Sequence, residues 1–306
     1  MTAAEDVRPV AGPGHRLGAA FAPAKINLAL HVIGRRADGY HLLDSLVAFA
    51  GIGDTIEAIA NPSTTEPRLT ITGPFAAGLE AGPDNLVLRA ALAHATAGGR
   101  IDGFDLRLTK SLPVASGIGG GSADAAATLP LLTEIAPLPA TAADTLRTQA
   151  ERLGADVPMC LISTPLRATG IGEVIEPLPG FPPLPMVLVN PGVAVSTPAV
   201  FRGLARADNP PLPALPPVFS DAEAVAEWLK TTRNDLENPA IAALPLIAAS
   251  LAEMAATDGC RLARMSGSGA TIFGLFATWT EAERAAAALS NAHPAWWVVA
   301  STAAGS

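Results

Sequence analysis

The sequence predicts an α+β fold in two domains, and two observations indicate it. In the first half, a strand-like segment at residues 104–109 leads into a glycine-rich stretch and then into an Ala- and Leu-rich helix. In the second half, strand-like and helix-like segments alternate, which suits helices packed against a sheet. We expect domains at residues 19–175 and 176–306, after a disordered leader at residues 1–18, with the Pro-rich stretch 177–185 at their junction.

Composition and charge narrow the class of protein. Hydrophobic residues make up 49% of the 306 residues, which is enough for real cores, and the formal net charge is −8. Nucleic-acid binders and acidic-membrane binders rely on basic patches, so we expect neither nucleic acid nor membrane as a partner. An anionic ligand must then be met by local cations. The composition predicts no oligomeric state.

Cysteine content and the first residues bear on the compartment. Cys160 and Cys260 are too few for a disulfide framework, which favours a reducing compartment. Residues 1–18 lack the continuous apolar core of a signal peptide. No window approaches the roughly eighteen apolar residues of a membrane span. We therefore expect a soluble, cytoplasmic protein.

The segments before the glycine-rich stretch are mostly predicted to be strands. Residues 19–32 are apolar apart from three polar side chains, which predicts an early strand pair or a strand–loop–strand. A polar turn with an Asp-Gly hairpin signal follows. An apolar run follows at 42–52, and the further elements expected here are strands at 55–59 and 69–71 and a helix at 86–97.

Four polar residues in these segments are candidates for function. Lys25 and Asn27 are two residues apart, so on an extended segment their side chains point to the same face. A Lys on an apolar strand is costly to bury without an anionic partner, and the alternative is a Lys whose head reaches solvent at a sheet edge. Tyr40 and His41 follow the polar turn directly. On the residues alone, we interpret both as packing residues.

The glycine-rich stretch Pro113–Ala123 is the strongest candidate for a ligand site. Its glycines let the backbone approach a ligand closely, and the N-terminus of the next helix, expected at 123–132, offers free N–H groups to a phosphate. The alternative is a flexible turn between a strand and a helix. The stretch has neither the Gly-Lys-Ser/Thr of a Walker A loop nor the dinucleotide spacing G-x-G-x-x-G. A cation must therefore come from elsewhere in the chain or from a metal.

A carboxylate, Asp156, follows the next expected helix, at residues 141–153. Because Pro158 restricts the residue before it, we expect an extended segment at residues 157–162. Asp156 would then lie at the mouth of a strand, where an Asp commonly forms a turn. On the residues alone, turn formation is the interpretation that we favour.

The rest of the chain predicts alternating elements around a second glycine-rich segment, Ser266–Thr271. The Pro-rich segment 210–217 is expected to be an extended excursion at the surface. Phe201 is expected in a helix that begins near residue 197, as a core residue. The further elements expected here are strands at 186–190, 271–276 and 296–300 and helices at 221–230, 244–256 and 280–289.

Five segments of the chain resemble one family, the GHMP kinases. Three carry the general resemblance: Pro23–Leu28, Pro113–Ala123 and Ser266–Thr271. The other two, Arg36–His41 and Leu153–Pro158, resemble one branch of the family, which phosphorylates a cytidyl-diphosphate methylerythritol. Each segment alone is a weak signal. Because all five occur in the expected order, the chain is identified as a member of the family by resemblance.

The resemblance implies a two-domain GHMP-kinase fold with the active site in the cleft between the domains. The N-terminal domain would bind ATP, used with Mg²⁺, and the phosphate acceptor would be the 2-hydroxyl of the methylerythritol in non-mevalonate isoprenoid precursor synthesis. The resemblance assigns no metal ligand. The implied ATP-binding residues are Pro113, Val114, Ala115, Ser116, Gly117, Ile118, Gly119, Gly120, Gly121, Ser122 and Ala123.

The resemblance also implies roles for single side chains. Lys25 and Asp156 would be the catalytic pair, in which Asp156 orients the hydroxyl and accepts its proton late, while Lys25 neutralises charge. The implied substrate-binding residues are Asn27 at the erythritol end and Tyr40, His41 and Phe201 around the cytidine base.

Two alternatives stay open. Another small-molecule kinase of the family, acting on mevalonate, homoserine or a sugar, would keep the shared motifs, but the turn Arg36–His41 favours a cytidine pocket. A non-catalytic relative would keep the fold, and the presence of both Lys25 and Asp156 speaks against it.

Overall fold

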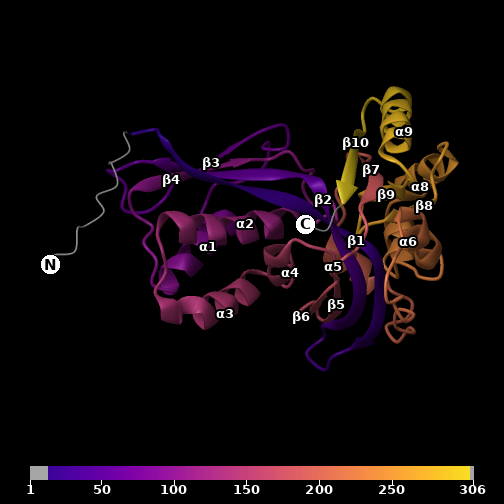
Figure 1. The fold of residues 1–306 in the computed structure, drawn as a ribbon, viewed down its shortest axis with the longest axis horizontal. Helices are drawn as coiled ribbons and strands as arrows, with labels where there is room; N and C mark the ends of the chain where they lie inside the picture. The colour runs from indigo at the N-terminus through magenta and orange to yellow at the C-terminus, as the bar shows by residue number, and fades with distance from the viewer. Residues whose placement is uncertain (1–12, 304–306) are drawn as a thin grey trace.

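A long antiparallel hairpin runs through the molecule, whose structure is a computed structural model that describes residues 13–303. The hairpin consists of β1 (Arg16–Arg35) and β2 (His41–Ala60), and the other strands extend the sheet from β2 (Figure 1). Along the sheet the order is β3-β4-β2-β10-β7-β9-β8, with β1 and β5 also paired to β2, and β6 paired to β5. These strands are β3 (Leu69–Thr72), β4 (Phe104–Thr109), β5 (Leu166–Gly170), β6 (Val174–Pro177), β7 (Leu184–Asn190), β8 (Leu262–Met265), β9 (Ile272–Leu275) and β10 (Trp297–Ala303).

The sheet is narrow where its two parts meet. β2 pairs with β10 at one position, Ala50 opposite Ala303. Beyond it, β10 pairs with β7 from residue 297 to residue 303. Strands from the first 177 residues therefore lie on one side of this contact, and β7 to β10 lie on the other (Figure 1).

Helices cover each part of the sheet separately. The first group, α1 to α4, packs together beside the β2–β4 part (Figure 1). The second group is α5 to α9, of which α8 and α9 pack against β7 to β10. The helices of the first group are α1 (Leu86–Thr96), α2 (Gly120–Ile135), α3 (Ala143–Leu153), which follows a short 3₁₀ turn (Ala140–Ala142), and α4 (Val157–Ile162). Those of the second group are α5 (Thr197–Arg202), α6 (Ala222–Leu229), α7 (Glu237–Ala243), α8 (Leu246–Ala256) and α9 (Trp279–Ala292).

The strand that leads into the glycine-rich stretch forms as its pattern predicts. In β4, Phe104, Leu106 and Leu108 are buried, while the residues between them are partly or fully exposed. The buried side chains belong to one hydrophobic cluster with Leu129 and Leu132 of α2. Fully burying such a side chain contributes about 1.5–3 kcal/mol. This packing holds the end of β4 and the start of α2 close together, so the stretch between them has little freedom.

Three sequence-based expectations were wrong. Residues 19–32 were expected to form a strand pair or a strand–loop–strand and instead belong to one strand, β1, whose partner is β2. The leader was expected to reach residue 18, but Arg16 and Gly18 already pair with β2, opposite Ile59 and Ala58. Residues 1–12 of the expected leader lie outside the described residues. Residues 157–162 were expected to be extended and form α4 instead, which buries Val157, Met159 and Cys160. Pro158 is compatible with this helix because it lies in the first turn, where a missing N–H costs no hydrogen bond.

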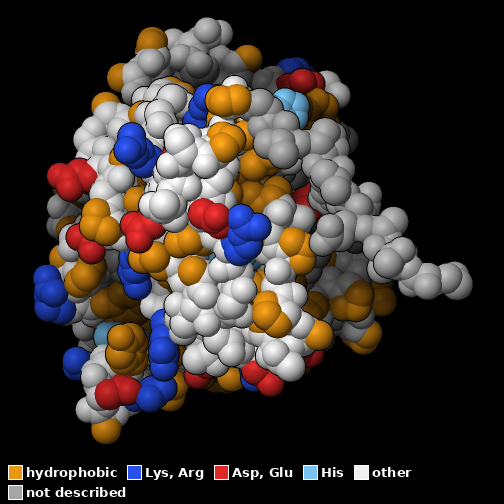
Figure 2. Space-filling model, turned by 90° about the vertical axis from the view of Figure 1, so that its left-hand side faces the viewer, with side chains coloured by type: hydrophobic (Ala, Val, Ile, Leu, Met, Phe, Trp, Pro, Cys, Tyr) orange, Lys and Arg blue, Asp and Glu red, His pale blue; other side chains and the backbone are white. Residues whose placement is uncertain are grey.

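On one face of the molecule, charges of both signs are mixed (Figure 2). Figure 2 shows the face that lies on the left in Figure 1, and on it Lys and Arg side chains lie interspersed with Asp and Glu side chains. Among residues 13–303, no helix has both the length and the apolar character that crossing a bilayer requires.

A buried cluster of three charges fixes the geometry around the glycine-rich stretch. Lys110, which follows β4, donates to Asp54 of β2 and, at 2.8 Å, to Asp124 of α2. Asp54 also accepts the backbone N–H groups of Ser111 and Leu112, at 2.6 and 2.9 Å. All three charged side chains are at most 5% exposed. The cluster therefore ties β2, the end of β4 and the first turns of α2 to one point.

Burial and neighbouring charges shift the pKa values of Asp124 and Lys110 in this cluster. Burial, opposed by the charge of Lys110, raises the pKa of Asp124 to about 7. Burial alone would lower the pKa of Lys110, but the charges of Asp124 and Asp54 outweigh it and raise that pKa. The Oδ1 atom of Asp124 is buried and has no hydrogen-bond partner among the described residues.

We expect Lys110→Met to lower the free energy of unfolding by about 3–5 kcal/mol, because it leaves two buried carboxylates without a cation. Asp124→Asn is the matched control: it should cost less, since Lys110 keeps Asp54 as its partner. Urea unfolding followed by circular dichroism measures both. Equal losses in the two variants would contradict a cluster centred on Lys110.

Candidate active site

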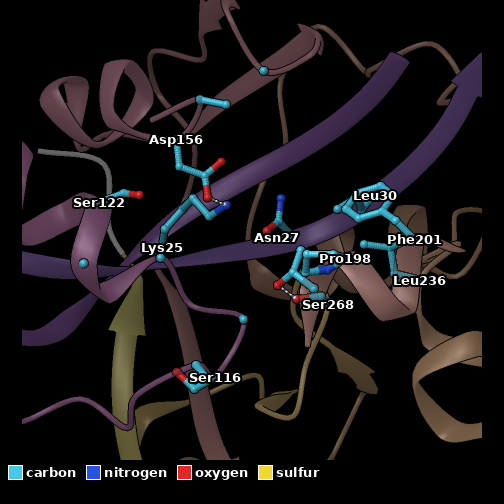
Figure 3. A pocket seen from close by; sticks show the side chains of 18 of the residues that line it. Lys25, Asn27, Leu30, Ser116, Ser122, Asp156, Pro198, Phe201, Leu236 and Ser268 are labelled. Carbon is cyan, nitrogen blue, oxygen red and sulfur yellow. Dashed lines mark hydrogen bonds and ion pairs between the residues drawn. The ribbon is translucent and has the colours of Figure 1, made fainter. Parts of the chain in front are cut away.

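One cavity of about 1210 Å³ contains most of the residues that the sequence singled out. It lies along β1 and β2 and is bounded by the glycine-rich stretch, α4, α5 and the second glycine-rich segment (Figure 3). All six expected side chains of the catalytic and substrate-binding sets line it: Lys25, Asn27, Tyr40, His41, Asp156 and Phe201. From the glycine-rich stretch, the cavity is lined by Pro113, Val114, Ala115, Ser116, Gly117, Gly119, Gly120, Gly121 and Ser122.

Two residues of the expected ATP-binding set are not part of the cavity lining. The side chains of Ile118 and Ala123 are buried in hydrophobic clusters. The N–H of Ala123 donates to the carbonyl of Gly119 at 2.8 Å, so it is not free for a phosphate. The carbonyl of Ile118 accepts the backbone N–H of Lys25 at 2.9 Å. Ile118 therefore connects the stretch to β1.

Lys25 and Asp156 form an ion pair inside the cavity. The Nζ atom of Lys25 is 2.7 Å from Oδ2 of Asp156 (Figure 3). The lysine side chain is 7% exposed and the aspartate side chain 38%, so the carboxylate is the partner that faces the open space. Asp156 reaches this position because it directly precedes α4, whose first residue is Val157. The pair brings together residues from two elements 131 positions apart.

At two positions the backbone of the glycine-rich stretch combines a positive φ with close neighbours, which favours glycine. Gly117 has φ +77°, and a Cβ there would lie 2.5 Å from the carbonyl oxygen of Ser266. Gly119 has φ +66° and precedes α2, and a Cβ there would lie 3.1 Å from Cβ of Lys25. The first N–H groups of a helix have no partner within it. Those of Gly120, Gly121 and Ser122 are therefore available to an anion in the cavity.

The second glycine-rich segment is bonded to the first. Ser266 donates its hydroxyl to the carbonyl of Gly117 and accepts the backbone N–H of Asn27, both at 3.1 Å. The N–H of Thr271 donates to the carbonyl of Ser116 at 3.0 Å. Ser266 is fully buried. The two segments and β1 thus form one rigid junction beneath the cavity.

Asn27 presents an unsatisfied acceptor. Its Nδ2 donates to the hydroxyl of Ser45 at 2.8 Å, and this hydroxyl donates to the carbonyl of Ala29 at 2.7 Å. The chain of bonds fixes the orientation of the amide. Its Oδ1 is buried and has no partner within residues 13–303. A buried acceptor without a partner costs free energy unless a ligand satisfies it.

An aromatic pair lies at the other end of the cavity. The rings of His41 and Phe201 stack with centroids 5.0 Å apart and planes 26° from parallel. Tyr40 is 60% exposed beside them. Burial and, next, the charge of Arg35 lower the pKa of His41, so its ring is neutral at pH 7. A neutral imidazole carries one donor and one acceptor.

Sequence reasoning missed the residues that hold the site in shape. Lys110, Asp54 and Asp124 were not singled out, although a Lys at the end of an amphipathic strand and an Asp in an Ala-rich helix are both signals of buried pairing. Ser266 was noted as part of a motif, without its role as a link between segments. Such contacts join positions far apart in the chain.

Comparison with known proteins identifies the family. The family described as "GHMP kinases N terminal domain" matches residues 85–164, and "GHMP kinases C terminal" matches residues 214–295. A protein from Dinoroseobacter shibae named 4-diphosphocytidyl-2-C-methyl-D-erythritol kinase is 54% identical over 94% of this chain and 95% of its own length. The resemblance to this branch of the family, seen in the motifs, is confirmed.

Solved structures agree. A crystal structure of 4-(cytidine 5'-diphospho)-2C-methyl-D-erythritol kinase is 35% identical, with a TM-score of 0.73, over 94% of this chain and 100% of that one. A homoserine kinase from Cytophaga hutchinsonii shares the fold with a TM-score of 0.64 at 18% identity, over 94% of each chain. The expected GHMP-kinase fold is therefore confirmed. The chain belongs to the GHMP kinase family.

Proposed function

We propose that this chain transfers the γ-phosphoryl group of ATP to the 2-hydroxyl of 4-diphosphocytidyl-2-C-methyl-D-erythritol, in non-mevalonate isoprenoid precursor synthesis. The observation that carries the proposal is the Lys25–Asp156 pair, 2.7 Å apart in one cavity with the glycine-rich stretch and an aromatic pair. The name of the 54% identical relative supports it. The division into an ATP-binding domain at 19–175 and a second domain at 176–306, and a cytoplasmic location, are part of the same proposal.

Phosphoryl transfer needs placement and charge stabilisation more than covalent chemistry by the protein. The N–H groups of Gly120, Gly121 and Ser122 would hold ATP phosphates at the positive end of α2. Lys25 would neutralise the transferred group. Asp156, whose carboxylate is held by Lys25, would orient the acceptor hydroxyl and take its proton late in the transfer.

Mg²⁺ is the metal that we propose to accompany ATP, and one residue fits it. Mg²⁺ prefers oxygen ligands and is commonly held by one or two carboxylates together with phosphates. Asp124 lines the cavity, and its buried Oδ1 has no partner among the described residues. Asp124 would therefore contribute a ligand, and the metal would supply the positive charge that the glycine-rich stretch lacks.

The substrate would lie along β1, with its ends held by different groups. The free Oδ1 of Asn27 would accept a hydrogen bond from a hydroxyl of the erythritol end. The cytidine base would lie by Tyr40, His41 and Phe201. Because a wrong base leaves buried polar groups unpaired, selectivity of this kind is large.

A panel of hydroxyl acceptors tests the proposal. ADP release, followed with a coupled assay, should be fastest by far with the cytidyl-diphosphate methylerythritol and slow with mevalonate, homoserine and galactose. Faster turnover of one of the other acceptors would assign the chain to another activity of the family. If none of the acceptors in the panel supports ADP release, the proposal is contradicted.

Asp156→Asn should lower kcat by about 10²–10⁴-fold, the usual effect of losing a positioned acid–base group. Binding of an ATP analogue should change little, because the carboxamide has the same shape, but the unfolding midpoint should fall, because the variant leaves the buried Lys25 without its anionic partner. Asp144→Asn, on the exposed side of α3, is the matched control and should leave kcat unchanged. Near-normal turnover of folded Asp156→Asn would leave Asp156 as a turn-former.

Gly119→Ala should weaken binding of an ATP analogue by about tenfold or more, which corresponds to at least ~1.4 kcal/mol. The added methyl group would meet Lys25 and would strain a residue at φ +66°. Gly103→Ala separates the two effects, because Gly103 has φ +85° but open space around its missing Cβ. Calorimetric titration measures both variants, and equal affinity losses would rule out a specific role for Gly119.

His41→Ala should erase the preference for the cytidyl substrate over its uridyl analogue. A neutral His41 offers a donor and an acceptor, which match a cytosine edge better than a uracil edge. Tyr40→Ala should weaken both substrates alike, since stacking does not distinguish the bases. The measurement is kcat/KM for the two substrates. A full preference for cytidine in His41→Ala would make His41 a structural residue.

A further inference from the structure

The two ends of the cavity differ in how their cations are compensated. At the end formed by the glycine-rich stretch, the positive groups are already paired. Lys25 pairs with Asp156, and Lys110 pairs with both Asp54 and Asp124. This end therefore has no surplus of positive side chains, and its donors to an anion are backbone N–H groups.

At the aromatic end, two arginines line the cavity without a carboxylate partner. Neither Arg35 nor Arg202 forms an ion pair within residues 13–303. The one side-chain hydrogen bond that the described residues give Arg35 runs from Nε to the carbonyl of Gly39, at 3.2 Å. The acidic residue at this end, Asp38, is 2.7 Å from the guanidinium of Arg36, which does not line the cavity.

The two arginines flank the stacked rings from different elements. Arg35 ends β1 and lies opposite His41 in the hairpin pairing. Arg202 ends α5 and directly follows Phe201, whose ring stacks on His41 at 5.0 Å. The guanidinium of Arg35 is close enough for its charge to help lower the pKa of His41. Both positive charges thus lie next to the pocket assigned to the base.

We propose that Arg35 and Arg202 bind the diphosphate of the cytidyl substrate, and so select a nucleoside diphosphate over a nucleoside; this inference rests on the proposed function. A guanidinium presents a planar fork of N–H donors that matches phosphate oxygens. A diphosphate attached to a nucleoside whose base lies beside His41 and Phe201 would lie next to the two arginines. The chain as a whole is acidic, with net charge −8, so a diphosphate depends on such local cations.

Both arginines are exposed, which sets the size of the effect. An exposed charge pair contributes little, and salt screens it. We expect each of Arg35→Gln and Arg202→Gln to weaken CDP binding about two- to fivefold, and the double variant about tenfold. Cytidine, which carries no phosphate, should bind all variants as it binds the wild type.

The experiment titrates CDP, CMP and cytidine by calorimetry into the full chain. A saturating non-hydrolysable ATP analogue is present, so that CDP is confined to the aromatic end. The wild type should bind CDP more tightly than CMP, and CMP more tightly than cytidine, with differences that shrink as salt is raised. Arg36→Gln is the matched control, because Arg36 is the neighbouring arginine but is paired with Asp38 and lies outside the cavity lining.

Each contrary result has a distinct meaning. Equal binding of CDP and cytidine by the wild type overturns the inference, and kinase activity on the cytidyl substrate would still stand. Equal losses of CDP affinity in Arg36→Gln and Arg202→Gln also overturn it, because they indicate a general electrostatic attraction instead of a binding site. Equal losses for cytidine and CDP in Arg35→Gln or Arg202→Gln would show that the arginines support the base pocket. Binding of neither ligand by the wild type overturns the inference together with the proposed substrate.

Discussion

A buried lysine is the constraint on which the rest of the site depends. Lys25 is 5% exposed in the middle of β1, and a charge so placed is unstable without an anionic partner. Asp156 is that partner, so α4 must approach β1 from 131 residues further along the chain. The N–H of Lys25 also binds the carbonyl of Ile118. The strand, the glycine-rich stretch and α4 therefore meet at one residue. Position 119 faces Lys25 and has φ +66°, so a side chain there would be strained and tightly packed.

Local patterns predicted the elements whose cause is local. The alternation in β4 and the glycine-rich stretch before α2 were both predicted, because strand periodicity and helix starts depend on neighbouring residues. Pro158 was compatible with an extended segment and with a helix start, and tertiary packing decided for the helix. Patterning alone also left Asp156 as a turn-former. Its placement opposite Lys25 came from resemblance, and the structure shows the two in contact.

Contacts between distant positions could not be predicted from one sequence. Asp54 and Lys110 are 56 residues apart, and nothing in the sequence around either residue indicates the other. The link from Ser266 to Gly117 spans 149 residues. Both contacts depend on the order of strands in the sheet, and single-sequence patterning does not set that order. The sequence therefore predicted which residues line the cavity better than which residues hold them in place.

The cavity divides its work between backbone and side chains. At the glycine-rich end the donors are peptide N–H groups whose positions are fixed by α2 and by the Lys110 cluster. Fixed donors need no reorganisation when charge develops, which favours catalysis. At the aromatic end the surface consists of side chains such as Tyr40 and Phe201. Substitutions can change these without moving the backbone, so under the proposed function recognition of the acceptor can diverge while the end proposed for the nucleotide stays constant.

The link between the two glycine-rich segments also orders events during synthesis of the chain. Gly117 leaves the ribosome 149 residues before Ser266, the residue that binds its carbonyl. Until then the carbonyls of Gly117 and Ser116 lack the partners that they have in the finished protein. An N-terminal part that folds early therefore has β1 and α2 but not the junction beneath the cavity. The growing chain would acquire the final shape of the glycine-rich stretch only when the second segment has emerged.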